Sequence, residues 1–481
     1  LFEFMRETHP GIQDMSVDTF LKITQNCGPE FLTIYDSQEQ REPFIFEIIR
    51  SLPKTISDLE NHQKLVFYQA LGTILSNLRQ ESEIGYQLSG SLHLVQEQWN
   101  SLLQQLNVST IQDPEFSRGL TFCLRAFDSL AGTMGHFYYI HLGQIFPQMT
   151  QLYEHYSQYI SAEVGSRGPV CLSHSQLINA RAVRKRILGL LSTYTKVCES
   201  PALLTESFVP SIVDKVLGEF VNSPAECREC EAISLMADLT NKVGTGMLPY
   251  MNAVLRPFLD TVLNMLVQDF HSYPEHRSAF FELIKAVTEH CFDALLQLPI
   301  ERFKVAVDAV IWASKHHSMP HAEAGLLTLK AILFNLENSG QVANYFYQHF
   351  YMYILTEVLA IMTDSAQLPN FKHHAHILRY LFFLVESGAI SVPIAEQAQT
   401  PENNKNYIVS HLTSLLAQTF TNMNSVQIEA LVLSMFNKCN EISSFKTALR
   451  DFLVNTKQIA NDNEAFYAEE KEKEIEEAKR R

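Results

Sequence analysis

The chain has 481 residues with a formal net charge of −16, and 46% of its residues are hydrophobic while 19% are charged. This length exceeds what one hydrophobic core usually supports, so the sequence predicts several domains or a repeat array and excludes wholesale disorder. The acidic surplus disfavours binding to nucleic acid or to an anionic membrane and favours protein partners that carry basic patches.

Apolar residues recur at helical spacing along almost the whole chain, and no convincing run of strict alternation predicts a β-strand. Near the start, Ile12, Met15, Thr19 and Ile23 form one such stripe. Glycine and proline number only 18 each, which indicates long helices joined by short connections. The predicted helices pair near 1–9 and 12–27, 40–51 and 61–77, 89–106 and 114–131, 137–162 and 177–198, 205–221 and 225–243, 248–267 and 275–296, 299–317 and 320–337, 341–363 and 369–387, and 405–420 and 425–438, with a last helix near 445–460.

This pairing repeats about every 40 to 50 residues, the period of HEAT-type helical hairpins. The predicted fold class is therefore all-α, a superhelical HEAT-repeat α-solenoid of about ten antiparallel hairpins, each burying its apolar face against its neighbours. We divide the chain into an opening hairpin at 1–27, a continuing solenoid at 28–460 and a charged tail at 461–481 that is either a solvated helix or disordered.

The eight cysteines are scattered, which indicates reduced thiols in a cytosolic or nuclear protein. The most membrane-like stretch, 345–362, carries Gln348, His349 and Glu357, so we expect an amphipathic helix and no membrane contact. The chain starts in mid-pattern without an initiator methionine, and we interpret it as a piece of a longer protein.

Motifs that carry chemistry are missing from the sequence. It contains no phosphate-binding loop of the form GxxxxGK[ST], no GxGxxG, no GxSxG and no HExxH. We therefore expect a protein that is not an enzyme and that needs no cofactor.

Two clusters have the residue types of metal ligands. Cys227 and Cys230 form a CxxC without the second pair that a structural zinc site needs, so we interpret them as two packed thiols, with zinc as the alternative. His373, His374 and His376 have no carboxylate or cysteine at ligand spacing, which favours a polar helix start over a metal site. The histidines at 316, 317 and 321 are interpreted in the same way, and no metal is expected.

The sharpest basic cluster contains Arg181, Arg184, Lys185 and Arg186. A solvated helix face is our first interpretation, and a docking patch for an acidic partner is the alternative.

The opening segment is the strongest candidate for a binding site. Four large apolar residues, Leu1, Phe2, Phe4 and Met5, would lie on adjoining faces of one helix, which is wider than a single core stripe needs. They either form an adaptable apolar lining or are buried against a preceding repeat, and composition leaves both open. The charged residues that could surround the lining are Glu3, Arg6, Glu7 and Lys22.

Long runs of the sequence resemble the chromosome region maintenance exportins, the receptors for leucine-rich nuclear export signals in the importin-β superfamily. The first is LFEFMRETHPGIQDMSVDTFLKI at 1–23. The others, in the family's order, are QWNSLL (98–103), SFVPSIVDKVL (207–217), DFHSYPEHRSAFFELIKAV (269–287), EHCFDALLQLP (289–299), FKVAVDAVIWASKH (303–316) and LRDFLVNTKQIA (449–460). The resemblance covers essentially the whole chain, as the C-terminal half of such a receptor. It departs from the family pattern at Pro10 and beyond about residue 468.

The resemblance implies a receptor that shuttles between nucleus and cytoplasm. Such a receptor binds cargo proteins with leucine-rich nuclear export signals together with GTP-bound Ran, and it crosses the nuclear pore by contacting pore proteins. In the family the signal docks in a groove between two adjacent repeats, and the second of them corresponds to the hairpin at 1–27. Carried over to this sequence, the groove would be lined by Leu1, Phe4, Met5 and Met15, with Glu3 and Glu7 at its edge.

Two other classes of protein remain as alternatives. A generic HEAT-repeat scaffold subunit of a signalling complex would have the same fold and unrelated partners. An enzyme with an unrecognised site would need a pocket in which titratable side chains converge.

Overall fold

The computed structural model describes residues 1–34, 42–268, 273–337, 339–420, 423–457, 463–468, 471–472 and 475. These residues form helices and turns without a β-strand, so the predicted all-α HEAT-type class is confirmed. They group into two compact units, residues 1–286 and 287–481, which we call unit 1 and unit 2. Each unit is described by itself.

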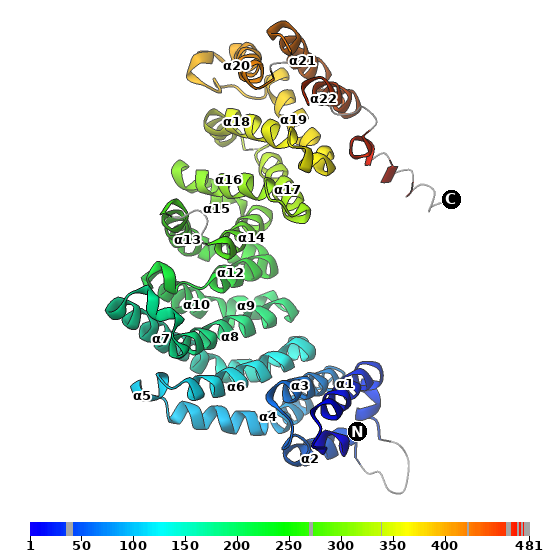
Figure 1. Ribbon diagram of the computed structural model, residues 1–481, viewed down its shortest axis with the longest axis vertical. Helices are drawn as coiled ribbons and strands as arrows, with labels where there is room; N and C mark the ends of the chain where they lie inside the picture. Colours follow the sequence, from blue (N-terminus) through cyan, green and yellow to red (C-terminus); the bar gives the residue numbers. More distant parts are fainter. Residues whose placement is uncertain are drawn as a thin grey trace. The chain divides into compact units, whose positions relative to one another are not determined.

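Unit 1 contains the following helices (Figure 1): η1 (Phe4–Arg6), α1 (Pro10–Cys27), η2 (Gly28–Leu32), α2 (Phe44–Thr55), α3 (Asn61–Leu75), α4 (Glu81–Gln104), α5 (Val108–Ile111), α6 (Pro114–Met134), η3 (Gly135–Tyr138), α7 (Tyr139–Arg167), η4 (Pro169–Ser173), α8 (Ser175–Val197), α9 (Pro201–Ser207), α10 (Val209–Ile212), η5 (Val213–Leu217), α11 (Gly218–Asn222), η6 (Ala225–Cys227), α12 (Cys230–Val243), η7 (Gly244–Met247) and α13 (Leu248–Gln268).

Unit 2 begins inside α14 (Pro274–His290) and continues with α15 (Phe292–Leu296), α16 (Ile300–Ser314), α17 (Met319–Asn335), α18 (Gln341–Met362), η8 (Ser365–Asn370), α19 (Phe371–Glu386), η9 (Glu396–Ala398), η10 (Pro401–Asn403), α20 (Asn404–Thr419), α21 (Ser425–Lys438), α22 (Ile442–Lys457) and η11 (Glu464–Tyr467).

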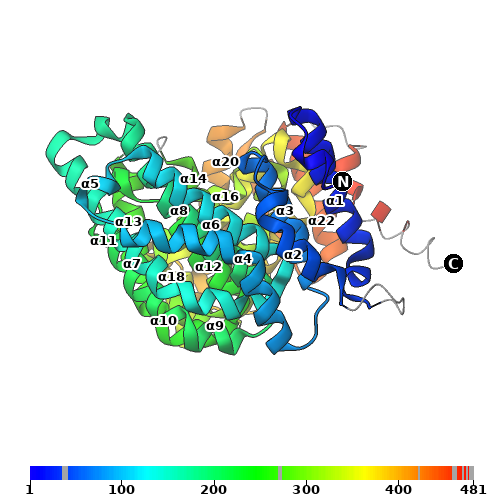
Figure 2. The ribbon, with the colours of Figure 1, turned by 90° about the horizontal axis from the view of Figure 1, so that it is seen from below.

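The helices of unit 1 pack in two layers. In one layer α1 contacts α3, α3 contacts α6, α6 contacts α8 and α8 contacts α12. In the other layer α2 contacts α4 and α4 contacts α7, and both views show these helices side by side (Figure 2). Because each hairpin gives one helix to each layer, its apolar stripe is covered by the next hairpin, as in a helical-repeat array.

Local signals in the sequence set the ends of these helices. The Asp113 carboxylate accepts a hydrogen bond from the Glu115 N–H, and Pro114 takes the first position of α6, where a missing N–H costs nothing. The same helix ends before Gly135, whose φ of 74° is a conformation that glycine adopts without strain. The resulting helix buries Leu120, Phe127 and other apolar side chains completely.

Unit 2 is built in the same way. The pairs α16 and α17, α18 and α19, and α20 and α21 are hairpins, and α17, α19 and α22 contact one another in turn. At the α16–α17 contact the backbones approach closely at Gly325, where a Cβ atom would lie 2.5 Å from the Ser314 backbone nitrogen. Near the C-terminal end, Phe466 is buried and its ring centroid lies 5.2 Å from that of Phe371.

Most predicted helices are confirmed to within a few residues, but three differ. The helix predicted at 89–106 begins earlier, at Glu81. The predicted helix at 1–9 is wrong, since only the single 3₁₀ turn η1 forms there. The predicted helix at 205–221 is interrupted around Pro210 and includes the π-helical turn η5. The division at 27 and 460 stays a prediction, and most of the charged tail at 461–481 lies outside the described residues.

Candidate functional site

Helix α1 carries two apolar faces. Its inner face is buried and contains Val17, Phe20 and Thr24. Its outer face, which we define as Ile12, Met15, Thr19 and Ile23, is exposed, with Met15 72% accessible. A helix at the surface of a globular unit normally has one apolar stripe, so a second, exposed one is what a partner-binding surface requires.

The inner face anchors α1 through aromatic packing. The Phe20 ring lies 5.1 Å from Phe67 of α3, 5.3 Å from Phe2 and 6.1 Å from Phe31, measured between centroids. Such clusters of rings stabilise the fold through their buried apolar area and through favourable edge-to-face contacts between the rings. The anchored inner face holds the outer face in a fixed orientation toward solvent.

Polar contacts tie the same helix to the start of α3. The Gln13 side-chain amide donates to the Asp58 carbonyl oxygen at 3.0 Å. The Asp14 carboxylate accepts from the Gln63 amide at 2.8 Å and lies 3.1 Å from the His62 ring nitrogen. The hydrogen bond from Gln63, followed by the one from His62, lowers the pKa of Asp14, so the carboxylate stays charged.

The segment before α1 is a turn rather than a helix. Pro10 disfavours helical backbone at His9, whose φ of −90° and ψ of 114° are extended. The His9 ring accepts a hydrogen bond from the Gly11 N–H and so caps α1 instead of continuing an earlier helix. The four apolar residues of the opening segment therefore do not share one helix.

The structure separates the six residues predicted for the site. Leu1 and Phe4 are exposed, at 42% and 55%, like Met15 on the outer face of α1. Glu3 and Glu7 are exposed beside them. Met5 is different, because its side chain is completely buried and its carbonyl oxygen faces the Gln13 amide, so it supports this surface from below.

Ile12 and Ile23 were not among the residues predicted for the site, although they share a stripe with Met15, and both are exposed, at 40% and 37%. The signal that separates them from the core was present in the sequence. Val17, Phe20 and Thr24 repeat at helical spacing on the opposite side of the same helix, and only one of the two stripes can face α3.

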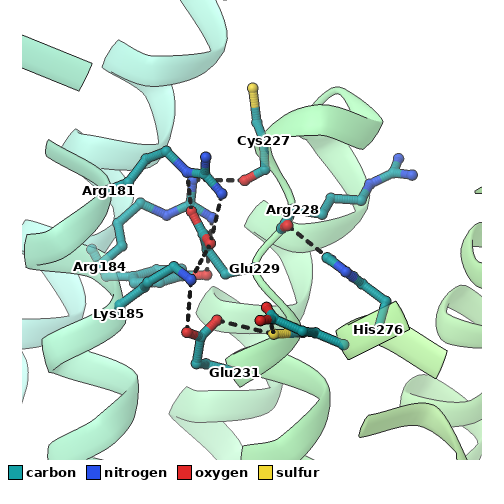
Figure 3. Close-up of polar contacts among 11 residues, drawn as sticks. Arg181, Arg184, Lys185, Cys227, Arg228, Glu229, Glu231 and His276 are labelled. Carbon is teal, nitrogen blue, oxygen red and sulfur yellow. Dashed lines mark hydrogen bonds and ion pairs between the residues drawn. The ribbon is translucent and has the colours of Figure 1, made fainter. Parts of the chain in front are cut away.

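The basic cluster of α8 is mostly an interior contact (Figure 3). Arg184 is completely buried, donates to the Cys227 carbonyl oxygen at 3.1 Å and lies over the Tyr153 ring. Arg181 donates two hydrogen bonds, of 2.7 and 3.0 Å, to the buried Glu229 carboxylate. The interpretation as a solvated face and the alternative of a docking patch are both wrong for these two residues, since their charges are used to fasten α8 to the segment before α12.

Lys185 completes this contact. Its ammonium group lies 3.4 Å from Glu229 and 2.8 Å from Glu231 in the first turn of α12. Burial raises the pKa of Glu231, but the hydrogen bonds from Lys185, the backbone and Cys230, together with the Lys185 charge, outweigh burial, so the pKa is lowered. Arg186 is the member of the cluster that remains exposed.

The predicted ligand-type clusters are also structural. Cys227 is buried in η6, and Cys230 lies at the start of α12 with its thiol 3.4 Å from the Glu231 carboxylate. His374 is buried in unit 2 and burial lowers its pKa to about 3, so it is not part of a polar helix start. His373 contacts Glu323 at 2.9 Å. Within the described residues, no group of three or more His, Cys, Asp or Glu side chains is arranged to hold a metal ion.

The histidines at 316, 317 and 321 lie at the α16–α17 connection as predicted. The His316 ring accepts from the Ser318 N–H at 3.1 Å, and the His321 ring lies 3.0 Å from the Ser318 hydroxyl. These contacts order the turn.

Of the helices that the structure describes, none has the length and apolar character needed to cross a membrane.

The fold and the exposed face of α1 define a helical-repeat protein with a surface suited to apolar partners. Comparison with protein families identifies the family of this helical-repeat protein. Residues 141–461 match the family model described as CRM1 C terminal. The chain belongs to this family of exportins.

Individual relatives agree with this assignment. Protein EXPORTIN 1B of Arabidopsis thaliana is 34% identical over 487 residues, which is 100% of this chain and 45% of the relative. Exportin-1 of Schizosaccharomyces pombe is 32% identical over 99% of this chain, and Exportin-1 of Drosophila melanogaster is 30% identical over 98%. The chain spans less than half the length of these relatives. A crystal structure of a Kap121p mutant aligns with a TM-score of 0.40 at 14% identity over 94% of this chain and 38% of that one.

Proposed function

We propose that this chain is the C-terminal half of a nuclear export receptor and that it binds leucine-rich export signals of cargo proteins on its opening hairpin. The observation that carries the proposal is the exposed outer face of α1, together with Leu1 and Phe4. Family membership and the name that the relatives share support the same function.

The surface fits such a signal chemically. Burying one apolar anchor is worth roughly 1.5–3 kcal/mol, and a flexible peptide loses much of that gain when it is ordered. Four or five spaced Leu, Ile, Val, Phe or Met side chains would therefore bind with modest net affinity. Glu3 and Glu7 lie at the edge, where they favour basic residues beside the signal and disfavour acidic ones.

A second ligand has to supply the remaining affinity. In our proposal GTP-bound Ran and the cargo each favour the same conformation of the receptor, so that each strengthens binding of the other. Contacts with nuclear pore proteins and shuttling between nucleus and cytoplasm complete the proposed cycle. In this cycle the receptor binds and carries its ligands and catalyses no reaction.

The generic scaffold remains the alternative function, and no observation on this chain favours it. The scaffold and the export receptor differ in how their binding of Ran depends on the nucleotide that Ran carries. A scaffold subunit has no reason to bind the GTP form of Ran more tightly than the GDP form, whereas an export receptor requires that difference.

The test measures fluorescence anisotropy of a labelled leucine-rich signal peptide with the full-length gene product, with and without GTP-loaded Ran. Met15→Glu places a charge in the centre of the proposed surface, and we expect an affinity loss of about 10- to 100-fold from one lost anchor. The matched control is Val426→Glu, because Val426 on α21 is also 72% exposed.

The proposal fails if Met15→Glu and Val426→Glu bind the peptide equally well. It also fails if GTP-loaded Ran leaves the affinity of the unmodified protein unchanged. Circular dichroism of both variants checks that the helices stay folded, which we expect since neither side chain contributes to a core.

A further inference from the structure

Three Ser-Pro or Thr-Pro dipeptides occur in the sequence, at Ser200–Pro201, Ser223–Pro224 and Thr400–Pro401. Proline fixes the backbone and carries no N–H, and one class of protein kinases phosphorylates a Ser or Thr only when proline directly follows it. The dipeptide alone is a weak signal, because a kinase modifies a hydroxyl only where the surrounding chain can enter its active site. The surroundings of the three hydroxyls therefore decide which of them a kinase can reach.

Ser200 and Ser223 are tied into the packing of unit 1. Ser223 is 2% exposed, and its hydroxyl accepts a hydrogen bond from Ser161 at 3.3 Å. Ser200 is half-buried, and its hydroxyl accepts from the Leu203 N–H at 3.3 Å and so caps α9. The Cys198 side chain, two residues before Ser200, is completely buried. A kinase could reach either serine only after part of unit 1 had opened.

Thr400 has different surroundings. It lies in the connection between α19 and α20 of unit 2, residues 387–403, and it is exposed, as Gln399 and Glu402 are. Its backbone is extended, with φ −132° and ψ 156°, which the following proline favours. The single turn after it, η10, contains no buried residue. Opening this turn for an active site breaks few contacts.

The rest of this connection is anchored. The Asn404 side chain accepts from the Ile394 N–H at 3.0 Å and donates to the Val392 carbonyl oxygen at 2.9 Å. Ile394 and Ala398 are each only 2% exposed. Connections of this length are uncommon in compact domains, and those that occur are often functional. The connection is therefore an ordered loop that presents Thr400 to solvent just beyond its last buried residue.

We propose that Thr400 is a phosphorylation site for a proline-directed protein kinase. In this reaction the γ-phosphoryl group of ATP is transferred to Thr400 Oγ1. The bond between the γ-phosphorus and its bridging oxygen breaks and ADP leaves with that oxygen, while the hydroxyl gives its proton to the kinase and forms the new P–O bond. The product carries about −1.5 to −2 additional charge at pH 7. This site is independent of the export function proposed above.

The added phosphate acts first on Glu402. Hydrogen bonds from the Glu402 N–H and from the Thr400 hydroxyl lower the pKa of this carboxyl. Phosphorylation removes the second bond and adds a like charge beside it, and both changes raise the pKa. Lys405, the nearest cation along the chain, is already paired with Glu386 at 2.8 Å. Carbon NMR of the Glu402 carboxyl group should show a higher pKa in the phosphorylated chain, and an equal or lower pKa would overturn this local effect.

The test incubates the intact chain with ATP and, separately, a mitogen-activated and a cyclin-dependent kinase, and maps the phosphate by mass spectrometry. Short peptides centred on the three acceptors correct for the sequence preference of each kinase. The rate in the folded chain divided by the rate in the peptide should be close to one for Thr400. For Ser200 and Ser223 we expect a ratio at least about tenfold lower, because modification of a protected site follows the population of its opened state.

Variants of the intact chain separate the roles of the hydroxyl and the proline. Thr400→Val keeps the shape of the side chain without the hydroxyl and should abolish phosphate uptake at this position. Pro401→Ala keeps the exposed hydroxyl and should slow its modification by about tenfold or more, since the kinase class reads the proline. The matched control, Thr419→Val, changes an exposed threonine that no proline follows and should leave phosphate uptake as it is.

Two results would overturn the proposal. In the first, neither kinase phosphorylates Thr400 in the folded chain, or Thr400→Val takes up as much phosphate as the unmodified chain. In the second, Ser200 or Ser223 is modified as efficiently as Thr400 relative to its own peptide. The second result would mean that the fold does not select the site.

Discussion

Arg184 and Glu229 are both almost completely buried in unit 1, and the charge of Glu229 is balanced by Arg181 and Lys185. Replacing Glu229 with glutamine keeps the shape but leaves Arg181 without its charged partner and Lys185 with Glu231 alone. We expect the free energy of unfolding of unit 1 to fall by about 2 kcal/mol. This is less than the 3–5 kcal/mol for a fully buried pair, because Arg181 and Lys185 keep contact with water.

The two tryptophans allow this measurement. Trp99 lies in unit 1 and Trp312 in unit 2, so urea unfolding followed by Trp99 fluorescence in a Trp312→Phe background reports unit 1. The control is Arg118→Gln, which breaks an exposed ion pair with Glu115 and should change the free energy by less than about 1 kcal/mol. Equal losses in the two variants would contradict the structural role of Glu229.

The buried His374 predicts a pH dependence for unit 2. Burial lowers its pKa to about 3 in the folded protein, against about 6.5 when unfolded, so the unfolded state binds the extra proton. Its contribution is therefore fully present above pH 6.5 and is lost as the pH falls, at up to about 1.4 kcal/mol per pH unit. The charged group that acts on it is His373, whose own pKa is also lowered by burial, against the hydrogen bond to Glu323.

The variant His374→Met removes the proton-binding group and keeps an apolar side chain of similar size. We expect it to flatten the loss of stability between pH 6.5 and pH 5, measured from Trp312 fluorescence in a Trp99→Phe background. The exposed His317→Met is the control and should leave the pH dependence as it is. An unchanged slope in His374→Met would show that other groups govern acid unfolding.

At the scale of single residues, the sequence predicted the positions of few charged and polar side chains correctly. Arg184 and His374 were both assigned to the surface because their residue types are usually exposed, and both are buried. What decides their place is a partner far away in the sequence, such as the Cys227 carbonyl for Arg184. Spacing along one helix carries no information about such partners.

At the scale of the element, α1 predicts opposite outcomes for its two faces. Phe20→Ala on the inner face should lower the free energy of unfolding of unit 1 by about 3–5 kcal/mol, because it removes a ring packed against three others. Met15→Ala on the outer face should change it by less than about 0.5 kcal/mol and weaken only peptide binding. Trp99 fluorescence in urea measures the first effect and anisotropy the second. A loss of stability in Met15→Ala would place that side chain in a core.

Element positions were predictable because long periodic stripes and Pro or Gly breaks are local signals. The pairs α16 and α17, α18 and α19, and α20 and α21 begin and end within a few residues of their predictions. The opening segment failed for a local reason as well, since Pro10 ends any helix that would precede it. Whether Met5 faces solvent depended instead on its packing in the tertiary fold, which a stripe does not show.

At the scale of the whole molecule, the proposed receptor must obey reciprocity. If GTP-bound Ran raises the affinity for a signal peptide by some factor, typically about 5- to 150-fold, the peptide must raise the affinity for Ran by the same factor. Titration calorimetry of each ligand in the presence and absence of the other, on the full-length gene product, measures both factors. Met15→Glu should lower peptide affinity and leave Ran binding without peptide unchanged. Unequal factors would rule out a single coupled equilibrium.

The cysteines offer a practical route to these experiments. Cys27, the last residue of α1, is exposed, whereas Cys123, Cys227 and the other cysteines are buried or half-buried. Burial also raises the pKa of Cys123 to about 12 and that of Cys227 to about 11, which keeps these thiols protonated and slow to react. A maleimide dye should therefore label the native chain first at Cys27, one turn beyond Ile23, and would report directly on what occupies α1.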